Sequence, residues 1–215
     1  MKNKTKKHTL LLTLTLIVGC ILTGCADFDA TRYVQSCLDA TFHGEFGDYM
    51  EMTKSTEDQA RVAYDSLIQS EVDALEQGYT ISDEQKEKFR ALFTDMYKLC
   101  KYEVGEAVKN DDDSFSVPVT TYKLTVFAGM SDAIEQYSTE YMNDNPDTSL
   151  DDAYAALFDY MYDFINEKIS NPEYAEGVTT NVNVPLTSTS PKTYTLSTSD
   201  LQNMVFDLLD VEESQ

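Results

Sequence analysis

Four cysteines and two histidines are the residues of this 215-residue chain with the strongest capacity for nucleophilic or covalent chemistry. Cys20 and Cys25 lie in the stretch IVGCILTGC, each directly after a glycine. A basic segment, MKNKTKKHT, and an apolar run over residues 10–22 precede Cys25. The run is shorter than the roughly 20 apolar residues that span a bilayer. A basic start followed by a short apolar run is typical of a secretory signal.

The end of the apolar run, Leu22-Thr23-Gly24-Cys25, resembles the lipobox of bacterial lipoproteins. In that family the cysteine thiol receives a diacylglycerol, and the signal is cut just before it. The resemblance implies a signal peptide over residues 1–24, lipid attachment at Cys25, and acyl chains that anchor the chain in the bilayer. It also implies a location on the extracytoplasmic side of a bacterial cell membrane.

Cys20 is the competing candidate, because Ile17-Val18-Gly19-Cys20 fits the same bare pattern. Cleavage there would leave only residues 10–16 as the apolar core of the signal. It would also leave Ile21 and Leu22 exposed at the new N-terminus. Cys25 is instead followed by Ala26 and Asp27, where the polar part of the chain begins, so we favour Cys25.

The charge of the chain excludes nucleic acid as a partner. Residues 1–25 hold four of the 16 basic residues and no acidic one, so the remainder carries 12 basic and 38 acidic side chains, a formal charge of −26. Phosphates would repel such a chain. The charge suits a solubilising surface.

Helical and strand periodicities follow one another along residues 29–209 and predict one α+β domain. Amphipathic helices are expected to pack on a small antiparallel sheet of about four strands in two hairpins. Ser82 to Gln85 forms a capping box, and Pro118 indicates an edge position or a bulge. Helices are predicted at 29–42, 46–52, 55–78, 82–100, 131–142, 149–171 and 198–209. Strands are predicted at 102–108, 115–126, 178–186 and 193–197.

The stretch YVQSCLDATFHGEFGDYMEMT, residues 33–53, resembles the start of small envelope lipoproteins with nuclear transport factor 2-like or cystatin-like domains. The resemblance implies a helix that wraps one face of a curved antiparallel sheet, and it supplies no catalytic residues. Residues 25–28 would form a very short tether, and residues 210–215 an acidic tail.

Cys37 and Cys100 remain after processing, and both lie on apolar helix faces. In an exported protein such a pair could form a disulfide, or the two could be buried thiols that pack as small hydrophobes. A nucleophile–base pair of Cys37 and His43 is disfavoured, because six residues along a helix do not share a face.

Two further patterns have alternative interpretations. The acidic loop 143–147, with Asp151 and Asp152, could hold Ca²⁺, but it lacks the EF-hand spacing, and turn and cap chemistry accounts for it. We predict no metal site and no cofactor. Six tyrosines could form a ligand platform, although core packing is favoured; they are Tyr137, Tyr141, Tyr154, Tyr160, Tyr162 and Tyr174.

Three functions follow. The favoured one is a membrane-anchored, non-enzymatic binding or interaction module for an unknown protein, peptide or sugar. The alternatives are a solute-binding receptor of an importer and a carboxylate-based envelope enzyme. No catalytic constellation stands out in the sequence, which predicts that the protein is not an enzyme.

Overall fold

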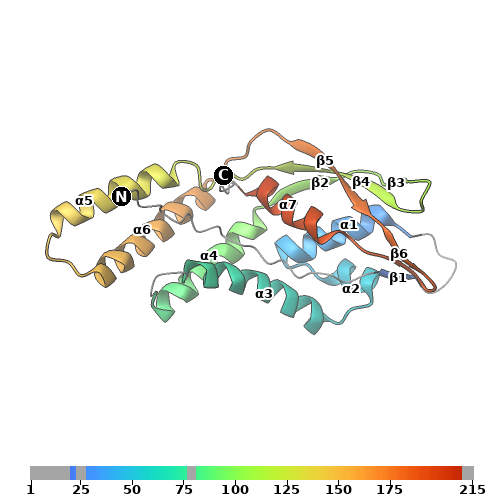
Figure 1. Cartoon of the computed structure of the whole chain (residues 1–215), viewed down its shortest axis with the longest axis horizontal. Helices are drawn as coiled ribbons and strands as arrows, with labels where there is room; N and C mark the ends of the chain where they lie inside the picture. The colour runs from blue at the N-terminus through green and yellow to red at the C-terminus, as the bar shows by residue number, and fades with distance from the viewer. Residues whose placement is uncertain (1–19, 23–27, 77–80, 210–215) are drawn as a thin grey trace, which may run out of the picture.

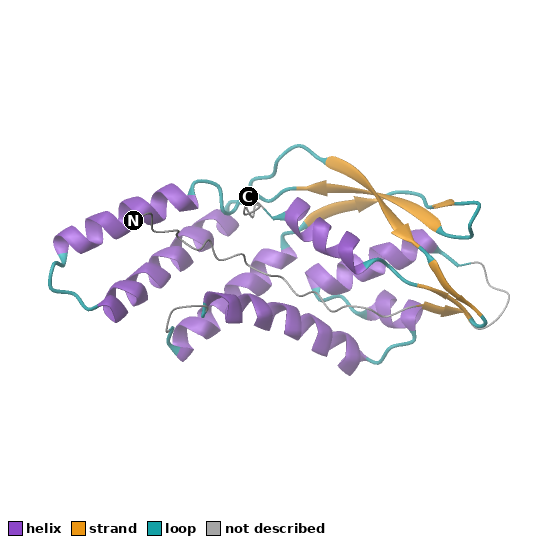
Figure 2. Ribbon diagram, viewed as in Figure 1, coloured by secondary structure: helices purple, strands orange, loops and turns teal. Residues whose placement is uncertain are grey.

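The computed structural model describes residues 20–22, 28–76 and 81–209. The described part is an α+β fold, as predicted, with helices packed on a small antiparallel sheet (Figures 1 and 2). The helices are α1 Ala30–Leu38, the π-helix η1 Asp39–His43, α2 Gly47–Thr53, α3 Glu57–Leu75, α4 Asp83–Lys98, α5 Met130–Asp144, α6 Leu150–Ser170 and α7 Thr198–Leu208. The strands are β1 Cys20–Leu22, β2 Lys101–Val104, β3 Val108–Lys109, β4 Phe115–Tyr122, β5 Val178–Val184, β6 Leu186–Thr189 and β7 Lys192–Tyr194.

The main sheet is built around β4, which pairs with β5 from Phe115 to Thr121 along one edge. On the other edge, β2 and β3 pair with β4 one after the other. The predicted first hairpin is therefore present, with a break between β2 and β3 opposite Pro118. A proline in the central strand removes one ladder donor, and the break falls where that donor is missing.

Thr31 on α1 repairs the ladder at this break. The Gly105 amide donates to the Pro118 carbonyl at 2.7 Å, but proline has no N–H to return a bond to the Gly105 carbonyl. The Thr31 hydroxyl donates to that carbonyl at 3.2 Å and accepts from the Ala107 amide at 2.8 Å. One threonine thus satisfies both backbone groups and ties α1 to the sheet.

The second predicted hairpin differs from the expectation of a strand over 178–186 paired with 193–197. The strand divides at Pro185: β5 stays in the main sheet, and β6 forms a hairpin with β7 in a separate small sheet. The backbone of β1 pairs with the other edge of β7. The split follows from Pro185, which has no N–H for continued pairing.

The first predicted helix also differs, because α1 gives way to the π-helix η1 before Gly44. Gly44 caps η1 in the left-handed conformation, with φ of 67°, and its amide donates to the Asp39 carbonyl. Such a π-turn widens the helix by one residue. It directs Asp39 and His43 toward β2, where both contact Tyr102.

The core lies between the sheet and the helices, with α1 and α7 packed against the strands (Figure 1). Outside them, α3 and α4 form an antiparallel pair that packs on η1. Both helices of this pair begin with a complete capping box, at Thr56 and Gln59 and at Ser82 and Gln85. The predicted apolar stripe of α4 is buried as expected, at Phe89, Leu92, Phe93, Met96 and Tyr97.

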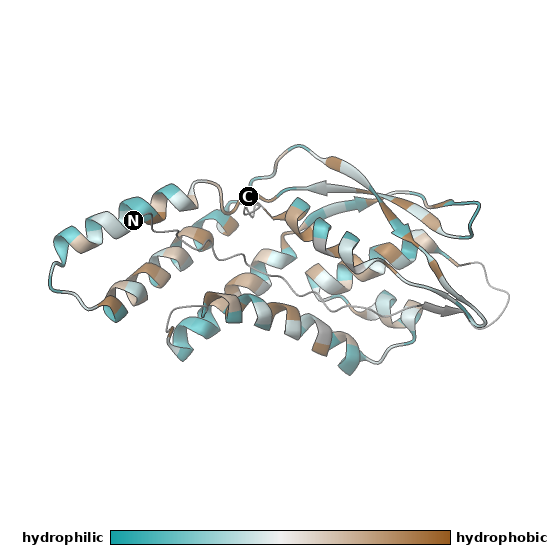
Figure 3. Cartoon of the chain, viewed as in Figure 1, coloured by the Kyte–Doolittle hydropathy of each residue, from teal (hydrophilic) through white to brown (hydrophobic). Residues whose placement is uncertain are grey.

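Helices α5 and α6 form an arm that projects from the body (Figure 1). We call residues 130–170 the helical arm. It joins the body where Phe89 of α4 meets Phe158 and Tyr162 of α6 edge-on, with ring centroids 6.2 and 6.0 Å apart. Much of α5 is hydrophilic in Figure 3, and α5 has no buried residue.

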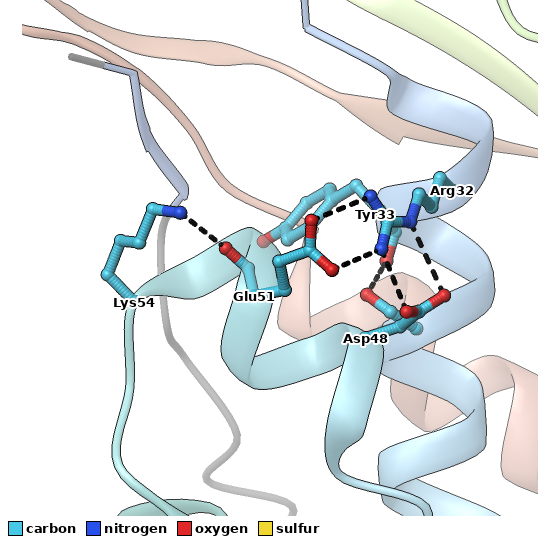
Figure 4. Close-up of polar contacts among 6 residues, drawn as sticks. Arg32, Tyr33, Asp48, Glu51 and Lys54 are labelled. Atoms are coloured by element: carbon cyan, nitrogen blue, oxygen red, sulfur yellow. Dashed lines mark hydrogen bonds and ion pairs between the residues drawn. The ribbon is translucent and has the colours of Figure 1, made fainter.

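An exposed ion-pair cluster joins α1 to α2 (Figure 4). The Arg32 guanidinium donates to Asp48 at 2.8 Å and to Glu51 at 2.7 Å. These hydrogen bonds hold the pKa of the Asp48 and Glu51 carboxyls below their ordinary values. Because the three side chains are solvated, the cluster orients the two helices more than it stabilises the fold.

Across the described residues, no helix is both long enough and apolar enough to cross a membrane.

Candidate functional site

A groove of about 710 Å³ runs between α3 and α4. Its volume lies within the roughly 300–1,000 Å³ of small-molecule sites. Residues spaced by three and four along α3 face it, which is the spacing of one helix face. The side chains that give it its chemistry are Asp65, Ser66, Gln69 and Asp73 from α3, and Arg90 and Thr94 from α4.

A chain of hydrogen bonds crosses the groove from one helix to the other. The Arg90 guanidinium donates to the side-chain oxygen of Gln69. The side-chain amide of Gln69 in turn donates to the Asp73 carboxylate at 2.5 Å. Arg90 also lies 3.5 Å from a Glu87 carboxylate oxygen. Arg90 is thus held in place while one third of its side chain remains exposed, with five donors in a fixed fork. A pre-positioned guanidinium of this kind suits a polar ligand with carbonyl or hydroxyl acceptors.

Tyr64 also lines the groove. Its ring is 9% exposed and meets Phe46 edge-on at 5.9 Å. Burial, together with the charges of Asp65 and Asp95, raises the pKa of its phenol. Tyr64 therefore supplies a neutral aromatic wall.

Carboxylate catalysis finds little support in the groove. Asp65 and Asp73 are eight residues apart on α3, which places them about 12 Å apart along the helix. Paired carboxylates in glycoside hydrolysis are roughly 5–9.5 Å apart. The arrangement can bind and orient a ligand, but the Asp65 and Asp73 carboxylates are too far apart to act together on one bond of that ligand.

A polar cluster that the sequence did not reveal surrounds η1. The Asp39 carboxylate accepts from the Tyr102 hydroxyl and from the Gln35 amide, each at 2.7 Å. His43 stacks on Tyr102 with centroids 5.2 Å apart, and its Nε2 donates to the Cys100 carbonyl at 2.9 Å. These groups bond mainly to each other, so the cluster fastens η1 to β2.

The buried carboxyl of Glu71 is the second group that sequence reasoning missed. Glu71 on α3 is 6% exposed, and its Oε1 accepts from the Tyr97 hydroxyl of α4 at 2.6 Å. Burial raises the pKa of Glu71 to about 7, and the Tyr97 bond opposes that rise. The glutamate occupies a position on the inner face of α3, and only the apolar pattern around it could have indicated its burial.

Of the predicted site residues, Cys25 lies outside the described residues, as do the other lipobox positions beyond Leu22. Cys37 and Cys100 are both described, and they are two buried thiols rather than a disulfide. Burial raises the pKa of the Cys100 thiol to about 12. His43 is engaged with the Cys100 carbonyl, so the structure gives no support to a nucleophile–base pair of Cys37 and His43.

The predicted tyrosine cluster is only partly core. Tyr137 of α5 stacks on Tyr160 of α6 with centroids 4.2 Å apart, and Tyr141 stacks on Tyr137 at 5.8 Å. All three rings are half-buried. They hold the two helices of the arm together while part of each ring faces solvent.

The acidic loop 143–147 joins α5 to α6. Ser149 caps α6 by accepting from the Asp152 amide at 3.1 Å and donating to the Asp152 carboxylate at 2.7 Å. Within the described ranges, no three His, Cys, Asp or Glu side chains gather so as to hold a metal ion.

Comparison with known proteins gives a fold likeness. No protein-family model and no curated protein matches the chain. A crystal structure from Bacillus subtilis subsp. subtilis str. 168, that of ycdA, described as a "putative lipoprotein", aligns with a TM-score of 0.59 and 14% identity. The alignment covers 86% of this chain and 56% of ycdA, so the chain spans little more than half the length of that protein. At this identity the likeness shows a shared fold.

Proposed function

We propose that the protein is a lipoprotein anchored on the extracytoplasmic side of a bacterial cell membrane, where it acts as a non-enzymatic binding module. The observation that carries the proposal is Leu22-Thr23-Gly24-Cys25 at the end of a basic and apolar leader. The fold shared with a protein described as a "putative lipoprotein" supports it. The position of α1 against the sheet agrees with the resemblance to nuclear transport factor 2-like and cystatin-like domains.

The anchor would hold one end of the domain at the membrane. Phe28 is 9% exposed and stacks on Tyr194 of β7 at 4.3 Å, so only residues 26 and 27 separate Cys25 from the packed fold. Fully extended, the three residue steps from Cys25 to Phe28 span about 10 Å. Cleavage before Cys25 would also remove β1 from the edge of β7.

The groove between α3 and α4 would be the binding surface for a polar ligand, such as a sugar or a short peptide. Its hydroxyl, amide and guanidinium groups match the acceptors and donors of those ligands, and Tyr64 offers an aromatic wall. The −26 charge of the chain after residue 25 disfavours an anionic ligand.

The alternatives have weaker support. Receptors of importers have two α/β lobes, whereas the described elements form one sheet-based body and a helical arm. A carboxylate enzyme needs a close pair of carboxylates, and Asp65 and Asp73 are too far apart along α3.

Ligand binding is testable on the full chain in neutral detergent with a panel of di- and trisaccharides and of short peptides. We expect a member of the panel to bind saturably, and Arg90→Ala to weaken its binding at least tenfold. Arg61→Ala, which removes an exposed arginine of α3 paired with Glu57, is the matched control and should bind as the wild type does. Equal affinities for both variants, or no saturable binding by any member, would contradict the groove as a ligand site.

A further inference from the structure

The helical arm lies at the end of the molecule opposite β6 and β7 (Figure 1). Phe28 packs on β7, so the proposed anchor at Cys25 would leave the arm pointing away from the membrane. The arm is attached to the body through α6, and α5 contacts α6 alone among the major helix contacts. The outer face of α5 is therefore a helix surface without a partner in the described part of the chain.

The arm concentrates negative charge. Residues 130–170 contain ten acidic side chains and one basic one, Lys168. All ten acidic residues are exposed, and none lies within ion-pair distance of a described Lys, Arg or His. On α1 to α4 the pattern is different, because most basic side chains there pair with a carboxylate.

The spacing of these carboxylates along α6 is unfavourable for that helix unless a cationic partner is bound. Asp159, Asp163 and Glu167 recur every four residues on α6, and like charges at this spacing repel one another across a helix turn. A cationic partner would relieve that repulsion. A second copy of the chain would increase it, as would an anionic lipid surface.

The tyrosine stack adds aromatic surface beside the carboxylates. Tyr141, Tyr137 and Tyr160 follow one another in contact, each half-buried. Burial raises the pKa of the Tyr137 phenol, with further contributions from Tyr141 and Asp159. The Tyr137 ring therefore stays neutral beside negative charge, and the electron-rich faces of the stacked rings suit an ammonium or a guanidinium placed over them.

We propose that the helical arm is a docking surface for a lysine- or arginine-rich segment of a partner protein. The carboxylates supply long-range attraction, which speeds encounter, and the tyrosines supply the contact that distinguishes a bound cation from a loose counterion. The exposed Met142 and Leu150, 43% and 69% exposed at the α5–α6 turn, add apolar contact at the tip.

Fluorescence anisotropy with a labelled deca-lysine and a labelled deca-arginine tests the proposal on the full chain in neutral detergent. The arm variant combines Glu140→Gln, Asp144→Asn and Asp163→Asn. The control variant combines Asp58→Asn, Glu106→Gln and Glu176→Gln, which removes the same charge from exposed positions on the body. Circular dichroism confirms that both variants fold.

We expect the arm variant to bind about tenfold more weakly than the wild type, and the control variant to lose less than twofold. Tyr141→Leu should weaken binding about threefold, while Tyr141→Phe, which keeps the ring, should not. Equal losses in the two charge variants would overturn the proposal. Binding to anionic vesicles or self-association through the arm, in place of peptide binding, would also overturn it. Peptide binding does not require the anchor, so its failure is distinguishable from a failure of the proposed lipidation.

Discussion

The Tyr97 hydroxyl donates to the buried Glu71 carboxyl at 2.6 Å and joins α4 to α3. The pair lies behind the groove, on the inner face of α3, where Glu71 is 6% exposed. Burial raises the pKa of Glu71 from 4.5 to about 7. Burial also raises the pKa of Tyr97 well above its ordinary value. Below about pH 7 the Glu71 carboxyl therefore favours its protonated form in the folded protein.

Glu71 makes the stability of the fold depend on pH. Its folded pKa is above its unfolded one, so its contribution is complete below about pH 4.5 and is lost as the pH rises through about 7. We predict that Glu71→Gln, which keeps the acceptor for Tyr97, removes this dependence. The free energy of unfolding of the wild type should fall by about 3 kcal/mol relative to the variant between pH 4.5 and 8. Urea unfolding at several pH values measures the difference.

Glu135→Gln, at an exposed position of α5, is the control for this experiment. It should follow the wild type across the pH range. A Glu71→Gln variant that keeps the wild-type pH dependence would show that Glu71 ionises normally in the fold.

Gly105 is required where the chain crosses Pro118. A Cβ at Gly105 would lie 2.8 Å from the Pro118 Cγ, whereas a Cβ at Gly47 would meet nothing within 4 Å. We predict that Gly105→Ala destabilises the fold by about 1–3 kcal/mol through overpacking. Gly47→Ala should be neutral or stabilising by up to about 1 kcal/mol. Thermal unfolding of the two variants checks the contrast, and similar melting temperatures would argue against the close approach.

The two thiols of the domain should be unreactive while it is folded. Cys37 and Cys100 are 4% and 3% exposed, and burial raises the pKa of Cys100 to about 12, so thiolate is scarce at pH 8. We predict that iodoacetamide labels neither site in the native protein and labels both in guanidinium. Peptide mass spectrometry measures each site. Rapid native labelling, or a peptide pair linked between Cys37 and Cys100, would contradict this.

Sequence patterns predicted the helices and the first hairpin because periodicity and caps are local. The capping box at Ser82 and the stripe of α4 are examples, and both are present. Local sequence does not determine the pairing of the second hairpin. Pro185 moved the strand after β5 into another sheet, and pairing partners far apart in sequence decide such a change.

The candidate site was harder to predict than the fold. The groove depends on how α3 packs against α4, and nothing in the sequence brings Arg90 to Gln69. The partial exposure of Tyr137 and Tyr160 likewise depends on the arm projecting from the body, since the same stripe would be buried in a bundle. Glu71 was hidden for a different reason, because a glutamate on a helix is ordinarily a solvent-facing residue.

The intact mass of the protein extracted from membranes tests the central claim most directly. We predict a mature chain that begins at Cys25 and carries the mass of two or more acyl chains on that residue. We also predict that a Cys25→Ser variant keeps its leader and lacks the acyl mass, while Cys20→Ser is processed and acylated normally. A chain that begins before residue 25, or a wild-type chain without acyl mass, would contradict the account.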